Sequence, residues 1–303
     1  MKKILVTGSN GLLGQKLVYK LKERTDVELI ATARGENRLL DRSGYAFHSM
    51  DIEDKENVNA VIDKVKPDHI IHTAAMTQVD DCELDHAACD RANVDAVKYI
   101  VEAAERNNCH LVHISTDFIF NGEDGPYDEE GVADPLSYYG AAKWKAELIV
   151  QKSKLKWAIL RTVLVYGIVD NMSRSNIVLW AKGALEKGNP INVVDDQFRS
   201  PTLAEDLADG CILAVDKNAT GIYNISGKDQ FSIIELVRTV ADYYGLDKSL
   251  IRPVSSATLN QAAKRPPVTG FILDKARREL GYDPHSFIEG IAIMEKQMEQ
   301  NVG

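Results

Sequence analysis

The first half of the chain alternates short apolar runs with longer segments in which apolar residues recur every three or four positions. The short runs are hydrophobic at nearly every position, as strands buried on both faces of a parallel sheet require. The predicted strands cover residues 4–7, 28–33, 46–49, 69–73, 111–115 and 157–162. The segments with helical periodicity cover residues 12–22, 58–65, 87–105 and 141–151. This alternation predicts an α/β fold, with a doubly wound parallel sheet that carries helices on both faces.

The pattern changes after about residue 165, where helical stretches alternate with shorter strands and prolines mark the loops. The predicted helices cover residues 176–186, 205–215 and 233–244, and the predicted strands cover residues 191–194 and 222–225. We expect two domains. Residues 1–167 form the large sheet, and residues 168–303 mainly form a smaller C-terminal α/β lobe that binds substrate. Some segments of the second part are expected to return to the first.

Composition and charge narrow the classes of partner. The 36 basic and 45 acidic residues give a net charge of −9, which argues against nucleic acid or an anionic membrane, because both attract a basic surface. No segment approaches the roughly 18 apolar residues of a membrane span. The apolar run after the two N-terminal lysines is too short for a signal peptide, so we expect a cytoplasmic protein. The four cysteines lack a C-x-x-C spacing, which predicts free thiols, and no metal site is predicted.

A glycine-rich segment follows the first predicted strand and opens the first predicted helix. Its sequence, TGSNGLLG, has the spacing G-x-x-G-x-x-G. In a dinucleotide-binding turn, such glycines allow a tight bend, a close approach of the backbone to the pyrophosphate, and close packing of helix on strand. The helix N-terminus adds free N–H groups and a partial positive charge. The segment predicts a Rossmann-type nucleotide site formed by Gly8, Asn10, Gly11, Leu12, Leu13 and Gly14.

The end of the second predicted strand indicates which dinucleotide is bound. NAD-dependent proteins usually place an aspartate or glutamate there to hold the ribose 2′-hydroxyl. Here the strand ends in the sequence ATAR, with Arg34 in place of an acid. The planar, permanently charged guanidinium suits a 2′-phosphate. NADP(H) is therefore the predicted cofactor, in preference to NAD(H).

The ends of the third and fourth predicted strands complete the expected nucleotide site. Asp51 and Ile52 follow the third strand, where an aspartate can accept a hydrogen bond from the adenine amino group. Small residues after the fourth strand let the backbone come close to the ribose on the nicotinamide side. Ligands bind at the carboxyl ends of strands in such sheets. The residues predicted at the fourth strand are Ala74, Ala75 and Met76.

A threonine, a tyrosine and a lysine form the candidate catalytic group. Thr116 lies at the end of the fifth predicted strand, where its hydroxyl can bond the substrate oxygen that changes between carbonyl and alcohol. Tyr139 and Lys143 are four residues apart and therefore lie on one face of a helix. A lysine ammonium beside a phenol lowers the pKa of the phenol, so the pair predicts that Tyr139 exchanges protons near neutral pH. Together with the glycine segment, this group predicts an oxidoreductase.

These features resemble the extended short-chain dehydrogenases/reductases, and more narrowly the dTDP-4-dehydrorhamnose reductase family. The sequence ISTDFIFNG at residues 114–122 is similar to the catalytic strand of that family. VDDQFRSPT at residues 194–202, followed by residues 206–208, is similar to its segment lining the sugar nucleotide. Similarity to its C-terminal lobe is carried by residues 221–227, 265–266 and 273–274.

The resemblance implies hydride transfer from NADPH to the 4-keto carbon of a deoxysugar nucleotide, with Tyr139 donating the proton. It implies that Lys143 holds the cofactor ribose and tunes Tyr139, and that Thr116 and Asp117 position the sugar. Arg199 and Arg265 are expected to bind the substrate diphosphate, because arginine pairs with phosphate through two hydrogen bonds. The expected partner is thus a small-molecule sugar nucleotide, and a homodimer is left open.

Two departures from this family keep other functions open. The strand arginine is followed by Thr162 and Val163 where rhamnose-forming enzymes commonly carry Ser-Trp, and Leu12 replaces a usual glutamine. Both changes are similar to the regulatory beta subunit of methionine adenosyltransferase, which suggests a non-catalytic NADP-binding partner protein. A third reading is a nucleotide-sugar epimerase or dehydratase. Such enzymes retain NAD, which would call for an acid where Arg34 stands, and dehydration would call for more acids beside the threonine than Asp117 alone.

Overall fold

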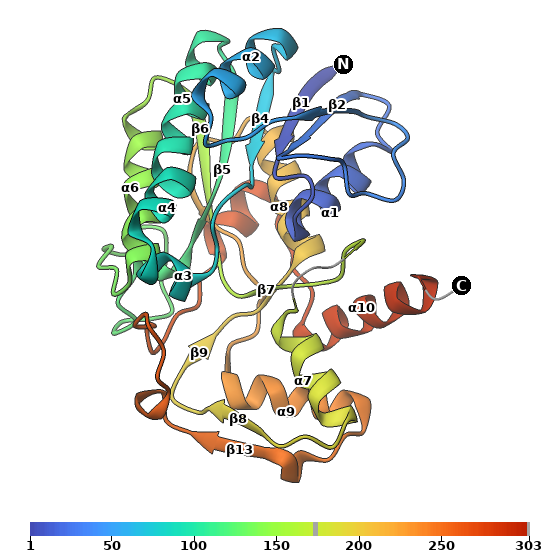
Figure 1. Cartoon of the computed structure of the whole chain (residues 1–303), viewed down its shortest axis with the longest axis vertical. Coiled ribbons are helices and arrows are strands. Elements are labelled where there is room, and N and C mark those ends of the chain that lie inside the picture. The colour runs from blue at the N-terminus through green and yellow to red at the C-terminus, as the bar shows by residue number, and fades with distance from the viewer. Residues whose placement is uncertain (172–174, 302–303) are drawn as a thin grey trace.

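The computed structural model describes residues 1–171 and 175–301 and is built around one large parallel sheet (Figure 1). Its seven strands run in the order β11-β6-β5-β4-β1-β2-β3. The order reverses at β1, since the chain builds outward through β2 and β3 and then places β4 on the other side of β1. Open α/β sheets bind ligands at such a switch point. The predicted doubly wound Rossmann sheet is therefore confirmed. The strands are β1 (Lys2–Thr7), β2 (Val27–Ala33), β3 (Ala46–Ser49), β4 (His69–His72), β5 (His110–Thr116), β6 (Lys156–Thr162) and β11 (Gly221–Asn224).

Helices cover both faces of the sheet, and each face has its own apolar core (Figure 1). Neighbouring residues of a strand point to opposite faces. Leu111 and Val112 of β5 accordingly belong to different cores. One face is covered by α1 (Leu12–Leu21) and α8 (Ala204–Asp216), and the other by α2 (Lys55–Val65), α5 (Ala96–Arg106) and α6 (Tyr138–Lys152).

The single helix predicted at residues 87–105 is divided in the structure. The short helices α3 (Val79–Leu84) and α4 (His86–Asp90) lead into a π-helical turn at Arg91–Asp95, and α5 begins only after it. Small and apolar residues recur with helical spacing straight through the turn, so the pattern could not show it. Single π-helical turns are frequent at functional sites. This one buries Asn93.

The smaller part of the molecule contains three two-stranded sheets and a third apolar core. The core lies among α7, α9 and α10, with β8 and β13 at its edge (Figure 1). The sequence pattern did not indicate β13, because Pro253 stands within its four residues, a position that edge strands tolerate. The strands are β7 (Val165–Tyr166) with β10 (Thr202–Leu203), β9 (Phe198–Arg199) with β12 (Phe231–Ser232), and β8 (Ile191–Val194) with β13 (Ile251–Val254). The helices are α7 (Ile177–Glu186), α9 (Ile233–Tyr244) and α10 (Phe287–Asn301).

The chain crosses between the two parts more than once. After α7, β8 and β9 it returns through α8 and β11, and β11 extends the large sheet beside β6. It then goes back to build α9 and β13, so neither part is a continuous segment. In the described part of the chain, no helix is both long and apolar enough to cross a membrane.

Candidate active site

The glycine segment forms a tight turn between β1 and α1 at the switch point. Gly8 has a φ of +68°, in the left-handed region, and a Cβ there would lie 2.9 Å from the backbone of Ala74. A Cβ on Gly14 would lie 2.2 Å from the carbonyl oxygen of Gly8. Gly11 is the N-cap of α1, and no side chain caps this end of the helix. The turn therefore presents backbone N–H groups in the way that an anion site requires.

The side chain of Asn10 ties this turn to the loop after β2. Its Nδ2 donates to the carbonyl oxygen of Glu36 at 2.8 Å, and its Oδ1 accepts from the N–H of Arg38 at 2.9 Å. Leu12 lies on the other side of the turn, against Gly167 in the segment after β7. Leu13 packs partly buried against the core. The predicted loop residues thus join three strand ends around one turn.

The end of β4 is fixed by side chains from two other elements. Thr7 Oγ1 accepts from the N–H groups of Thr73 at 3.1 Å and Ala74 at 3.3 Å. Asn93, from the π-helical turn, accepts from the N–H of Met76 and donates to its carbonyl oxygen, both at 2.9 Å. Asn93 was not predicted as a site residue. Its only sequence signal was an asparagine among the apolar positions of a predicted helix. All three residues predicted at this strand end are half-buried, namely Ala74, Ala75 and Met76.

Arg34 stands largely in solvent at the end of β2. Its side chain is 74% exposed, and its nearest charged neighbour is Glu53, with the two side chains 3.8 Å apart. Glu53 also lies 3.5 Å from Arg91. The Asp51 carboxylate accepts from the N–H of Glu53 at 3.0 Å, and Ile52 packs against the core. Arg34 can therefore turn toward a phosphate without breaking a tight contact.

Tyr139 and Thr116 lie together beneath the end of β5. Tyr139, in the first turn of α6, is 8% exposed and packs in a cluster with Cys82, Cys89 and Ala142. Met76 and Phe118 border this cluster, and Met76 links it through residues 74–75 to the glycine turn. The nearby Thr116 hydroxyl lowers the pKa of Tyr139. The structure thus brings the predicted catalytic group to the nucleotide side of the sheet.

Burial governs the protonation of this group. It raises the pKa of Tyr139 well above its ordinary value, and the nearby Thr116 hydroxyl only partly opposes the rise. Burial also lowers the pKa of Lys143 from 10.5 to about 8. The Lys143 ammonium donates to the carbonyl oxygen of Ile114 at 2.7 Å rather than to the phenol. The expectation that Lys143 brings the pKa of Tyr139 near neutrality is therefore wrong for this structure. Tyr139 holds its proton at neutral pH.

Arg199 is placed differently from the sequence expectation of a diphosphate ligand. It is 4% exposed, and its guanidinium donates to the carbonyl oxygens of Phe198 at 2.7 Å, Pro266 at 2.7 Å and Pro267 at 3.2 Å. Burial lowers its pKa, and the Asp117 carboxylate opposes this change. The N–H groups of Arg199 are thus taken by the chain itself.

Arg265 lies nearer the surface and has one acidic partner. Its guanidinium makes a bidentate pair with Asp80 of α3, at 2.7 and 3.2 Å. The Arg265 side chain is 18% exposed and that of Asp80 is 40% exposed. Asp80 also accepts from the N–H of Ala263 at 3.0 Å. This pair bridges the two parts of the molecule.

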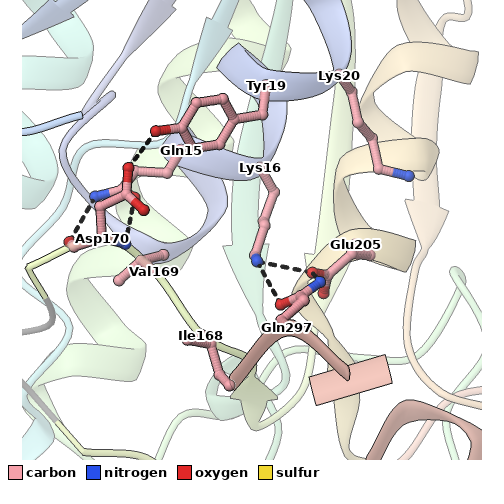
Figure 2. Close-up of a pocket in the computed structure, with 9 residues that line it drawn as sticks. All are labelled: Gln15, Lys16, Tyr19, Lys20, Ile168, Val169, Asp170, Glu205 and Gln297. Atoms are coloured by element: carbon pink, nitrogen blue, oxygen red, sulfur yellow. Dashed lines mark hydrogen bonds and ion pairs between the residues drawn. The ribbon is translucent and has the colours of Figure 1, made fainter. Parts of the chain in front are cut away.

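A cavity of about 330 Å³ lies apart from these residues, on the outer side of α1 (Figure 2). Lys16 is paired within its wall, 2.8 Å from Glu205 and 3.0 Å from Gln297, whereas Lys20 pairs with Asp209 outside it. It includes none of the predicted site residues. Its lining residues are Gln15, Lys16, Tyr19, Lys20, Ile168, Val169, Asp170, Glu205 and Gln297.

The cysteines and the possible metal ligands were expected to hold neither a disulfide nor a metal ion. Cys82, Cys89, Cys109 and Cys211 are free and buried. Within residues 1–171 and 175–301, no group of three or more histidine, cysteine, aspartate and glutamate side chains is arranged to hold a metal ion.

Several known proteins are similar to this chain over nearly its whole length. It is 31% identical over 296 residues to the dTDP-4-dehydrorhamnose reductase of Aggregatibacter actinomycetemcomitans, covering 94% of this chain and 95% of that protein. It is 28% identical over 270 residues to methionine adenosyltransferase 2 subunit beta of Bos taurus, covering 88% and 78% of the two chains.

Solved structures extend this similarity to the fold. A dTDP-4-dehydrorhamnose reductase from Clostridium acetobutylicum superposes with a TM-score of 0.86 at 27% identity, over 98% of this chain and 99% of that chain. The enzyme from Bacillus anthracis, solved in complex with NADP, superposes with a TM-score of 0.84 at 27% identity, over 98% and 100%. The family model of the RmlD substrate binding domain matches residues 1–300. The chain therefore belongs to the RmlD substrate binding domain family, and the resemblance to dTDP-4-dehydrorhamnose reductases and the extended short-chain dehydrogenases/reductases is confirmed.

Proposed function

We propose that this protein reduces the 4-keto group of a deoxysugar nucleotide with NADPH. The observation that carries the proposal is the buried Tyr139, which is protonated at neutral pH and lies near Thr116, on the side of the sheet where the nucleotide is expected. Reduction of a carbonyl needs a hydride at carbon and a proton at oxygen. A tyrosine that keeps its proton until the oxygen becomes basic suits the second task.

The residues at the switch point fit a dinucleotide. Gly8 and Gly14 allow the tight turn and close backbone packing of a dinucleotide loop, because a Cβ at either position would clash with backbone. Arg34 is free to meet a 2′-phosphate, and the Bacillus anthracis relative was solved with NADP. When bound, NADPH supplies the hydride. Lys143 would hold the nicotinamide ribose. For this, its ammonium would turn toward the ribose hydroxyls from the carbonyl oxygen of Ile114, to which it donates in this structure.

The sugar nucleotide would lie between the two parts of the molecule. In this proposal residues 1–167 bind the cofactor, and residues 168–303 mainly form the substrate lobe, although β11 belongs to the large sheet. Thr116 would contact the reacting oxygen. Arg265 is the better placed diphosphate ligand, because it is partly exposed and has a single acidic partner, whereas Arg199 is buried among carbonyl oxygens.

A second candidate is a non-catalytic partner protein that binds NADP. Its support is the identity of 28% to methionine adenosyltransferase 2 subunit beta of Bos taurus and of 30% to that of Xenopus tropicalis, together with Leu12 in the glycine turn. Against it stands the complete group of Thr116, Tyr139 and Lys143. Relatives solved with NAD, including a dTDP-glucose 4,6-dehydratase from Streptomyces venezuelae at 24% identity, share the fold alone.

The deciding experiment follows NADPH oxidation with a panel of 4-keto-6-deoxysugar nucleotides that differ in sugar and base. We expect turnover with at least one member and none without the sugar nucleotide. NADPH affinity is measured in parallel by fluorescence. Tight NADPH binding without turnover of any member would contradict the enzymatic function and favour the partner protein.

A further inference from the structure

The carboxylate of Asp117 is buried directly beside the catalytic threonine. It is 2% exposed, and both of its oxygens accept hydrogen bonds. Oδ1 accepts from the Thr116 hydroxyl at 3.0 Å, and Oδ2 accepts from the Thr269 hydroxyl. The Arg199 guanidinium nitrogen Nε lies 3.9 Å from Oδ2. A buried carboxylate with so many partners is unavailable to a sugar in this arrangement.

Two of these partners belong to the smaller part of the molecule and are fastened to each other. The N–H of Thr269 donates to the carbonyl oxygen of Phe198 at 3.0 Å, and the N–H of Phe198 donates to that of Pro267 at 2.8 Å. Arg199 follows Phe198 in β9 and donates to the carbonyl oxygens of Pro266 and Pro267. Thr269 and Arg199 therefore reach Asp117 as one unit.

Arg199 also contacts the catalytic group through an aromatic side chain. The Arg199 guanidinium lies 5.9 Å from the ring centre of Phe118. The Phe118 ring in turn meets the ring of Tyr139 edge to face at 5.9 Å. The same arginine is thus linked to the threonine through Asp117 and to the tyrosine through Phe118.

The hydrogen of the Thr116 hydroxyl can be assigned from its partners. A hydroxyl has one hydrogen and two lone pairs, and a carboxylate only accepts. The hydrogen of Thr116 therefore lies toward Asp117, and one lone pair accepts from the N–H of Phe118 at 3.2 Å. The Thr116 hydroxyl also lowers the pKa of Tyr139, which is the effect of a group that can donate to the phenolate. After Tyr139 has given its proton away, Thr116 can turn its hydrogen to the phenolate.

We propose that Asp117 is a positioning residue that orients the Thr116 hydroxyl toward Tyr139, and that Thr269 and Arg199 hold it in place from the smaller part of the molecule. This inference rests on the reductase function proposed above and deepens it. The placement of the substrate-binding part controls the proton-donating centre through one carboxylate. It also gives Arg199 a task other than contact with the diphosphate.

Thr269 offers the cleanest test, because its hydroxyl can be removed at nearly constant volume. Thr269→Val leaves Asp117 without one donor, and Thr269→Ser keeps that donor. We expect Thr269→Val to lower kcat between about tenfold and a hundredfold, because misplaced reacting groups lose rate, with NADPH affinity unchanged. Thr269→Ser should restore most of the rate. Equal losses in both variants, or a loss of NADPH affinity in step with kcat, would show a merely structural role and overturn the proposal.

The pH profile supplies a readout that a packing defect would not move. The charged and titratable groups facing Asp117 are Arg199 and Tyr139, and the Thr269 hydrogen bond lowers the pKa of Asp117. Loss of that bond raises this pKa, so the ionised carboxylate that holds Thr116 is present only at higher pH. The ascending limb of kcat against pH should therefore shift upward in Thr269→Val and return in Thr269→Ser. An unshifted limb would contradict the proposal.

A structural readout separates this inference from the proposed function. Crystal structures of the wild-type protein and both variants are determined with NADP⁺ bound. We expect Thr116 to change rotamer in Thr269→Val and to keep it in Thr269→Ser. An unchanged Thr116 in Thr269→Val would overturn the positioning role, whatever the wild-type protein does with sugar nucleotides. Absence of wild-type turnover with the expected rotamer change would instead overturn only the reductase function.

Discussion

The two ends of the candidate site are built by different means. At the cofactor end, the glycine turn and the end of β4 are shaped by backbone that approaches backbone, with Gly8 against Ala74. At the substrate end, Asp117 and Arg265 are held by side chains from distant segments. The first arrangement is complete before any ligand arrives. In the second, the pair of Arg265 with Asp80 would have to open if Arg265 binds the substrate diphosphate.

The two ends of the site should therefore bind their ligands in different ways. A preformed backbone site binds its ligand without rearrangement, which keeps the entropic cost of binding low. Paired side chains at the substrate end keep charges satisfied in the empty protein, but they compete with the ligand for the same donors. Substitutions at the cofactor end should therefore change binding or chemistry directly, whereas a substitution of Asp80 at the substrate end should act by removing a competitor for Arg265.

The largest effect is expected at Tyr139, where the two ends meet. Tyr139→Phe removes the proton donor and keeps the ring and its packing. Turnover of the sugar nucleotide should fall by about 10²–10⁴, because positioned acid catalysis contributes that much. NADPH affinity should be unchanged. Single-turnover reduction and fluorescence titration measure the two quantities.

The adjacent tyrosine provides a matched control. Tyr138 is in the same turn of α6, but its hydroxyl bonds to Asp90 at 2.7 Å and its ring stacks on His86. Tyr138→Phe should keep the wild-type rate. A wild-type rate in Tyr139→Phe would mean that another group donates the proton.

Lys143 should show a conflict between stability and function. Its pKa of about 8 in the folded protein lies below the ordinary value of 10.5, so charging it costs the fold up to about 3 kcal/mol at neutral pH. Between pH 8 and 10.5 the unfolded chain holds the extra proton, and wild-type stability should rise with pH. Lys143→Met should be more stable than wild type at neutral pH, with a gain that shrinks across this window.

Denaturant unfolding of the protein without cofactor at several pH values measures this effect. Lys145→Met is the control, since Lys145 is on the same helix with a side chain that is 53% exposed. NADPH affinity should fall in Lys143→Met only. A stability difference that does not depend on pH would assign the effect to packing rather than to the buried charge.

Arg34 tests the choice of cofactor. Arg34→Ala should weaken NADPH binding by roughly ten- to a hundredfold and leave NADH binding nearly unchanged, because a charge-assisted hydrogen bond contributes about 1.5–3 kcal/mol. Titration of both cofactors against both proteins measures the ratio. Arg91 shares Glu53 with Arg34, so Arg91→Ala is a matched control. An unchanged ratio in Arg34→Ala would remove Arg34 from the cofactor site.

The same contrast explains what could be predicted from the sequence. The glycine turn and its two flanking elements depend on neighbours in the chain, so their residue types and spacing were enough. Asn93 and Thr269 act over long sequence separations, and their hydrogen bonds follow only from the packed fold. The raised pKa of Tyr139 could not be predicted either, because it comes from burial and because the Lys143 ammonium is turned to the carbonyl oxygen of Ile114, and both are properties of the tertiary structure.

The smallest effect is expected at Asp80, which competes for Arg265 at the substrate end. If Arg265 binds the diphosphate, the bidentate pair must first open, and partly exposed pairs of this kind contribute about 0.2–1 kcal/mol. Asp80→Asn removes the charge but keeps an oxygen for the N–H of Ala263. The KM for the sugar nucleotide should therefore fall by a factor of up to about five, with kcat unchanged. Asp81→Asn, at the exposed neighbouring position in α3, should leave KM unaltered. A rise of KM in Asp80→Asn would mean that the pair holds the substrate end in its binding shape, and Arg265 would then act through Asp80 rather than on the diphosphate.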